Sequence, residues 1–167
     1  VAQAQVSAGD WSGAIDAYEE WLLLAPADAE ARDGLWAAYD ARGSQRAAAA
    51  QPLEAQAQYA RAARPWEGAS ADYRAAQQVA SGHEPSARGG PAARLAAAEK
   101  GKRCAALLGQ ALALRNQRRW PEVIYALEAV QAEDPAYQRD RVASYLGEAL
   151  VENGQEALAA AASPAQI

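Results

Sequence analysis

The chain has 167 residues, with 21 acidic and 16 basic side chains, one cysteine and neither methionine nor phenylalanine. This length suits one domain, or about four to five repeats of ~34 residues, and the Ala-, Leu-, Glu- and Arg-rich composition favours helices over strands. A single cysteine excludes an internal disulfide, and no apolar run approaches the ~18 residues of a membrane span, so we expect no membrane insertion.

The first well-defined element is a helix predicted over residues 11–24. Gly9 is suited to ending a preceding helix over residues 1–8, because glycine adopts positive φ at little cost. Asp10 can then cap the next helix, and Pro26 stops it.

Further helices follow in chain order. Asp28 is suited to cap a helix over residues 29–42, and proline at a first helical position predicts two more helices that start at Pro52 and Pro65. The glycines around His83 predict a mobile loop. The predicted segments after residue 42 are helices 52–63 and 65–80, a loop over 81–91, two helices within 92–117 that meet near Gly101, a helix that starts at Trp120 and stops at Pro135, and a last pair that ends in a short helix near Ser163.

A tryptophan followed by a small and then a bulky residue recurs at helical spacing. Its three occurrences start at residues 11, 66 and 120, so they are 55 and 54 residues apart. Such regular spacing indicates internal duplication, and aromatic residues in this pattern are typical of a helix-packing core. The three occurrences are Trp11-x2-Ala14-x3-Tyr18, Trp66-x2-Ala69-x3-Tyr73 and Trp120-x2-Val123-x3-Leu127.

This pattern resembles the tetratricopeptide repeat, whose second helix carries Ala-x3-Phe followed by Pro, here Ala14-x3-Tyr18 and then Pro26. The segment Leu146-Gly147-x2-Leu150-x3-Gly154 resembles the first helix of such a repeat. Pro135 and the Tyr137-Gln138-Arg139-Asp140 stretch after it look like a linker common in bacterial members. The resemblance implies an all-α, right-handed solenoid of antiparallel helix pairs. One repeat domain over 1–167 would then consist of units over about 1–64, 65–117 and 118–167.

In repeats of this family the first helices line a concave surface that binds a protein or peptide. Carried over position by position, the resemblance implies a partner-binding surface. The lysines and asparagines with which some members grip a carboxyl terminus are absent from it, so that specific activity is not expected. The implied positions are Asp33, Ala37, Asp40, Glu54, Gln58, Arg61, Leu108, Leu112, Arg115, Ser144, Glu148 and Val151.

Charge is unevenly distributed along the chain. Residues 1–40 hold eight acids and one base (net −7), residues 41–120 hold thirteen bases and five acids (+8), and residues 121–167 hold eight acids and two bases (−6). This alternation is unlike a uniformly basic nucleic-acid binder, so no nucleic-acid partner is expected. A basic cluster is predicted as a solvated face or as a contact for an acidic partner. It consists of Lys100, Lys102, Arg103, Arg115, Arg118 and Arg119.

No constellation of residues predicts catalysis, a metal site or a cofactor. His83 is the only histidine and stands in the predicted loop without a second ligand type near it. Cys104 is predicted to begin a helix near basic residues, which would lower its thiol pKa, but a lone cysteine is more often a small packing residue. The sequence therefore indicates a non-enzyme.

Three functions remain open. The first is a protein–protein interaction scaffold that holds a protein or peptide. The second is a structural subunit, possibly extracellular, whose copies stack end to end into a filament through open solenoid ends. The third is a helical accessory segment of a larger bacterial protein. Because the chain begins at Val1 rather than methionine, we expect a piece of a longer protein or a processed one, either cytoplasmic or exported.

Overall fold

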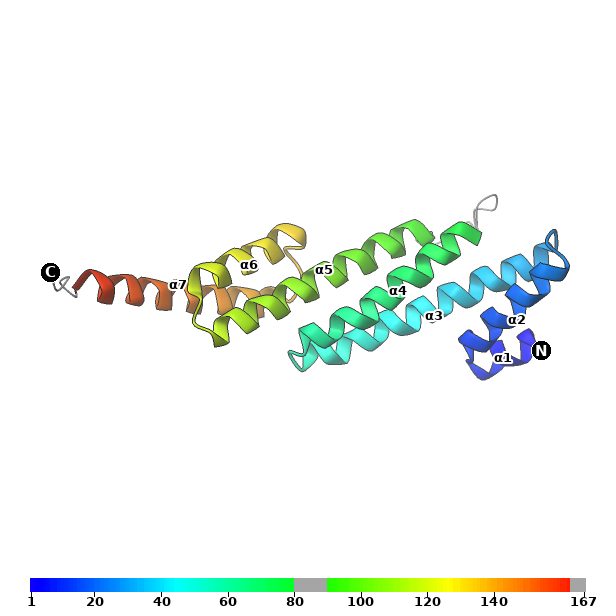
Figure 1. Ribbon diagram of the computed structural model, residues 1–167, viewed down its shortest axis with the longest axis horizontal. Coiled ribbons are helices and arrows are strands. Elements are labelled where there is room, and N and C mark those ends of the chain that lie inside the picture. The colour runs from blue at the N-terminus through cyan, green and yellow to red at the C-terminus, as the bar shows by residue number, and fades with distance from the viewer. Residues whose placement is uncertain (80–89, 163–167) are drawn as a thin grey trace. The chain divides into compact units, whose positions relative to one another are not determined.

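The computed structural model describes residues 1–79 and 90–162, and these residues are predominantly helical (Figure 1). No strand is present among them, so the all-α prediction is confirmed. The helices found in this part of the chain are α1 (Ala2–Ala8), α2 (Trp11–Leu24), α3 (Ala29–Ala55), α4 (Tyr59–Val79), α5 (Pro91–Asn116), α6 (Trp120–Glu133) and α7 (Arg139–Ala162).

The helices are divided between two compact units. Val1–Ala57 and Arg61–Lys102 form unit 1, while Gln58–Ala60 and the chain from Arg103 onward form unit 2. Unit 1 therefore holds α1 to α3, most of α4 and the first half of α5. Unit 2 holds the second half of α5 together with α6 and α7.

Helix α2 begins and ends as predicted. Asp10 Oδ1 accepts a hydrogen bond from the Gly13 backbone N–H at 3.0 Å, which satisfies one of the free donors at the helix start. Gly9 ends α1 in the left-handed conformation, at φ 72°. The predicted capping residues therefore form the caps at this end of unit 1.

The face of α2 that carries the repeated motif packs on α3. Ala14, Ile15 and Tyr18 are buried there, against a cluster that includes Leu35. A Cβ placed on Gly34 of α3 would lie 2.4 Å from Tyr18 Cζ, so the tyrosine ring rests directly on the glycine backbone. The close approach of α2 and α3 therefore depends on one small residue under one aromatic ring.

The predicted helix starts at Pro52 and Pro65 are wrong, because both prolines lie inside longer helices, α3 and α4. A proline in a helix leaves the carbonyl four residues earlier without its N–H donor. Here those carbonyls belong to Ala48 and Arg61, which are both exposed, so water can replace the missing donor. The helices continue because the carbonyl without a donor belongs to an exposed residue in each case.

Two glycines that were predicted to mark helix ends lie inside helices instead. The helix predicted over 29–42 continues past Gly43, and the predicted break at Gly101 is absent because α5 is one helix. A Cβ on Gly43 would lie 2.8 Å from Tyr73 Cε1, and a Cβ on Gly101 would lie 2.8 Å from Trp66 Cε2. Both glycines therefore make room for an aromatic ring of α4 rather than end a helix.

The core of unit 2 is formed by α5, α6 and α7, with Tyr59 from the start of α4. Leu108, Val123 and Leu127 are among its fully buried side chains. The predicted short last helix is instead the end of the 24-residue helix α7. Ser163 and most of the loop predicted over 81–91, including His83, lie outside the described residues.

The small and bulky positions of the repeated motif are core residues, as predicted. Ala14, Tyr18, Ala69, Tyr73, Val123 and Leu127 are all buried. The three tryptophans are less alike. Trp120 is 5% exposed, whereas Trp11 and Trp66 are only partly buried. The indole N–H of Trp66 donates to Glu54 Oε1 at 2.8 Å, and that of Trp120 donates to Glu156 Oε1 at 2.9 Å.

Candidate functional site

Two of the residues implied to face a partner are core residues. Leu108 is fully buried in unit 2, and Glu54 is 6% exposed in unit 1, where it accepts the Trp66 hydrogen bond. Side chains in these positions are not available to a partner. Both residues lie in helices that are longer than a single repeat helix, Glu54 in α3 and Leu108 in α5.

Three further members of that set are engaged within the chain. The Arg115 guanidinium binds both carboxylate oxygens of Glu148, with its shortest contact, Nη2 to Oε1, at 2.7 Å. This hydrogen bond is the main reason why the Arg115 pKa is raised. Asp40 forms an ion pair with Arg94. The structure thus brings Arg115 and Glu148 together, but as partners of each other.

The remaining positions differ in exposure. Leu112 is half-buried against the unit 2 core, and Gln58 is half-buried at the turn between α3 and α4. The exposed members are Asp33, Ala37, Arg61, Ser144 and Val151.

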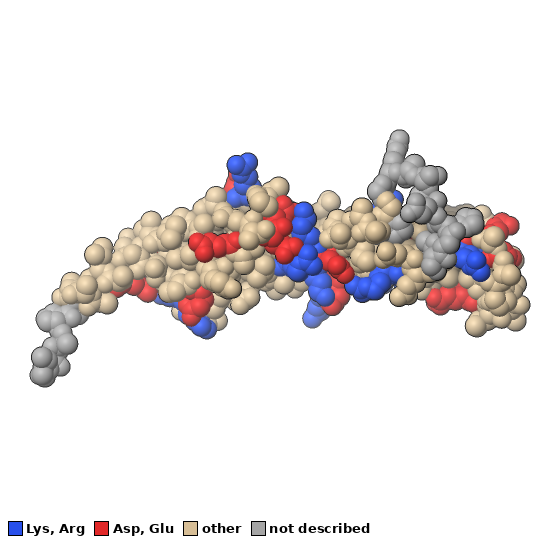
Figure 2. Space-filling model, turned by 90° about the horizontal axis from the view of Figure 1, so that it is seen from above, with Lys and Arg blue, Asp and Glu red and all other residues tan. Residues whose placement is uncertain are grey.

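The predicted basic cluster is largely neutralised by glutamates of the same chain. The cation–carboxylate distances are 2.6 to 2.8 Å, and the atoms of the two charge types lie beside one another on the face in Figure 2. Exposed pairs of this kind stabilise a fold by only ~0–1 kcal/mol each, yet they remove the net positive surface that an acidic partner would need. The pairs are Lys102–Glu67, Arg103–Glu133, Arg115–Glu148 and Arg119–Glu122.

The most deeply buried carboxylate described in unit 1 belongs to Asp72, which the sequence did not single out. The Asp72 side chain is 2% exposed, and it binds the Nη2 of Arg42 and the Nη1 of Arg46, both at 2.8 Å. Arg46 also donates to the Gly68 carbonyl, and Arg42 to Ser12 Oγ. The cluster fastens α3 to α4 and to the start of α2. Its carboxylate is enclosed by its own cations, so it has a structural role.

Tyr39 extends this polar network to the middle of α2. Its hydroxyl donates to Glu19 Oε1 at 2.6 Å, and the Arg42 guanidinium lies 5.5 Å from its ring centroid. Burial, followed by the hydrogen bond to Glu19, raises the pKa of Tyr39 to about 12. The phenol therefore stays neutral throughout the physiological range.

A pocket of about 310 Å³ opens where α1, α2 and α3 meet in unit 1. Its apolar wall includes Ala2, Tyr18 and Trp21, and its polar wall includes Glu30 and Asp33. Trp21 is 51% exposed at this pocket. A half-exposed aromatic side chain and two exposed carboxylates therefore line one pocket. We call it the Trp21 surface.

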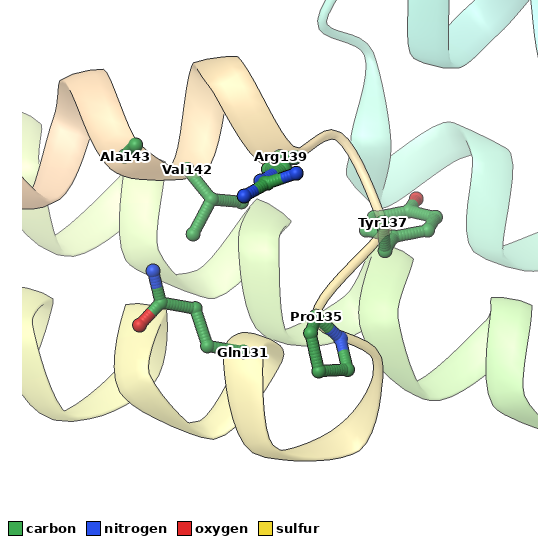
Figure 3. A pocket seen from close by; sticks show the side chains of 6 residues that line it. All are labelled: Gln131, Pro135, Tyr137, Arg139, Val142 and Ala143. Carbon is green, nitrogen blue, oxygen red and sulfur yellow. The ribbon is translucent and has the colours of Figure 1, made fainter.

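A second pocket, of about 300 Å³, lies in unit 2 at the turn between α6 and α7 (Figure 3). Gln131 of α6 faces Val142 and Ala143 of α7 across it, and Pro135 of the turn closes one side. Arg139 is the one charged residue in its lining. This pocket is a gap beside a helical turn, and it combines fewer recognition groups than the Trp21 surface.

The described residues hold no group of three or more histidine, cysteine, aspartate or glutamate side chains that could bind a metal ion. Cys104 is buried inside α5 and so does not begin a helix, contrary to the sequence-based expectation. None of the helices in the part that the structure describes is long and apolar enough to cross a membrane.

The described residues thus form an all-α protein of packed helices, with a pocket lined by an aromatic side chain and two carboxylates. No protein-family profile, curated protein or solved structure matches the chain.

Proposed function

We propose that this chain is a non-catalytic protein–protein interaction module made of tetratricopeptide-like helix pairs arranged as a right-handed solenoid. The packing of α2 on α3 and of α6 on α7 supports this proposal, because in each pair the small and bulky motif positions are buried. Helical-repeat proteins of this type bind segments of other proteins on their surfaces.

The observation that carries the proposal is the Trp21 surface. Large aromatic side chains that stay half exposed beside a cavity are the residues most often responsible for binding energy in protein interfaces. Glu30 and Asp33 stand at the same pocket, and residues 1–40 carry a net charge of −7. The partner that fits this chemistry is a basic, amphipathic segment, whose apolar side chain enters the pocket while Lys or Arg meets the carboxylates.

End-to-end filament assembly through charge receives less support. That hypothesis needs the basic middle of one copy to meet an acidic end of another. In the structure Lys102, Arg103 and Arg119 already contact glutamates of their own chain. Little positive charge from this cluster is left to attract a neighbour.

The proposal is tested with two synthetic peptides of equal length and identical leucine positions, one with lysine and the other with glutamate between them. Isothermal titration calorimetry should show binding of the lysine peptide alone. Trp21→Ala should weaken it by about 30-fold or more, the loss expected of a central interface aromatic. Asp33→Asn should weaken it less, and the weakening should shrink in high salt.

Glu128→Gln serves as the matched control, because Glu128 is an exposed acid of α6 in the other unit. It should leave the affinity unchanged. Equal affinity for both peptides, or lysine-peptide binding that survives Trp21→Ala, would show that the Trp21 surface is not the binding site.

A further inference from the structure

The outer face of α7 is apolar although it is exposed. Val142 and Ala149 point into the unit 2 core, whereas Leu150, Val151 and Leu158 are 53%, 58% and 73% exposed. The end of α7 forms a largely uncharged region in Figure 2. An unpartnered helix face with three large apolar side chains is unusual for a surface that meets only water.

The exposed positions of this face follow a regular spacing. Six of them alternate in steps of four and three residues, the 3.5-residue period of helices that pair lengthwise. All six are exposed, and none is charged. We call them the α7 seam: Ala143, Gly147, Leu150, Gly154, Ala157 and Ala161.

The two glycines of the α7 seam do not make room for any neighbour in the part of the chain that the structure describes. A Cβ on Gly147 or Gly154 would meet nothing within 4 Å, in contrast to Gly43 and Gly101, which lie under aromatic rings. Glycine inside a helix costs roughly 0.5–1 kcal/mol relative to alanine. Room for a close neighbour outside the chain would account for both positions.

We infer that α7 pairs antiparallel with α7 of a second copy of this chain. The sizes of the seam residues are self-complementary in the antiparallel register that pairs all six of them. Leu150 of each copy then lies opposite Gly154 of the other, Gly147 lies opposite Ala157, and Ala143 lies opposite Ala161. Because a two-fold contact occurs twice, the Leu150 side chain of each copy lies opposite a glycine of the other copy.

Charge also favours a second copy as the occupant. Of the carboxylates beside the α7 seam, Glu148 binds Arg115 and Glu156 accepts the Trp120 hydrogen bond, while the exposed Asp140 precedes the seam by three residues. Two copies therefore meet without facing like charges, despite the net charge of −6 over residues 121–167. A basic helix, by contrast, would find no carboxylate along the α7 seam to pair with.

The size of the contact sets its strength. The α7 seam from Ala143 to Ala161 is about 27 Å long at 1.5 Å per residue. A single helix pair of this length buries less than the ~1,200 Å² typical of stable complexes. The dimer is therefore weak and depends on protein concentration. This inference is independent of the proposed Trp21 surface, because the two surfaces belong to different units.

Sedimentation equilibrium of the purified chain at concentrations up to about 1 mM tests the inference. The mass should rise toward that of two copies and no further. Leu150→Glu should keep it at one copy, whereas Tyr125→Glu, on the 76% exposed side chain of Tyr125 in α6, should leave the dimer unchanged. Circular dichroism should show that both variants stay helical. A wild-type chain that remains a monomer, or that grows beyond two copies, would overturn the inference.

Cysteine cross-linking in a Cys104→Ala background tests the register. The double variant Gly147→Cys/Ala157→Cys should form a disulfide-linked dimer, because these positions face each other only in the antiparallel register. Gly147→Cys alone should not, since it faces itself only in a parallel pair. Cross-linking of the single variant would refute the antiparallel pairing, because a parallel pair would link both variants.

Discussion

At the scale of single residues, partners far apart in the sequence decide which charged groups the fold can bury. Asp72 meets Arg42, which lies 30 residues earlier, and Arg46, 26 residues earlier. No local pattern marks these three residues as a cluster, which is why sequence reasoning missed it. The aromatic core positions were predictable, because their helical spacing is local.

Replacement of Asp72 by alanine should lower the free energy of unfolding by about 3 kcal/mol, since it leaves the largely buried Arg42 without its carboxylate. The figure is at the low end for buried pairs because the Arg46 side chain is 40% exposed and water can compensate it. Chemical denaturation measures the loss. Asp33→Ala, an exposed site, should change stability by no more than about 0.5 kcal/mol, and equal losses in the two variants would refute the structural role of Asp72.

Tyr39 makes stability depend on pH in an alkaline window. Its pKa of about 12 in the folded chain exceeds the ordinary value of 10.0, so the stabilisation is complete below pH 10 and is lost as the pH rises to 12. Accordingly, the stability advantage of the wild-type chain over Tyr39→Phe should fall across this window in denaturation curves. Tyr125→Phe, at a 76% exposed position, provides the reference. A constant difference between wild type and Tyr39→Phe would contradict the assignment.

At the scale of helices, the capping residues Asp10 and Asp28 predicted boundaries well, whereas Pro52, Pro65 and Gly101 predicted boundaries that are absent. Asp10 and Asp28 cap α2 and α3 because each carboxylate accepts from the backbone N–H three residues later. Pro52, Pro65 and Gly101 failed as boundaries because water or an aromatic ring compensates for each. These compensations depend on neighbours that a single sequence does not show.

The two kinds of glycine should respond oppositely to alanine. Gly101→Ala should destabilise the chain by about 1–2 kcal/mol, because its Cβ would press on the Trp66 ring and the overpacking exceeds the gain in helix propensity. Gly154→Ala should instead raise monomer stability by about 0.5–1 kcal/mol, because its Cβ points into open space. Thermal or chemical unfolding at low protein concentration makes the comparison, and a shared sign would contradict it.

At the scale of the whole molecule, the repeat pattern predicted an all-α chain, and the partner-binding positions that it implied include buried, ion-paired and exposed residues. The family frame selected Leu108 and Glu54, which are buried, and also Asp33, which belongs to the Trp21 surface. Trp21 lies three residues after Tyr18 of the repeated motif, yet its exposure depends on where α1 and α3 begin beside it. The acidic and basic segments could be recognised in the sequence, but the specific ion pairs that neutralise the basic cluster could not be predicted from it.

A charge-swap titration tests the central claim most directly, that the Trp21 surface recognises a basic amphipathic segment. The wild-type chain should bind the lysine peptide and not the glutamate peptide. Glu30→Lys/Asp33→Lys should reverse this preference, while Glu128→Lys should keep the wild-type preference. If the doubly substituted chain is folded and its preference is unchanged, the carboxylates at the pocket do not select the partner, and the account is contradicted.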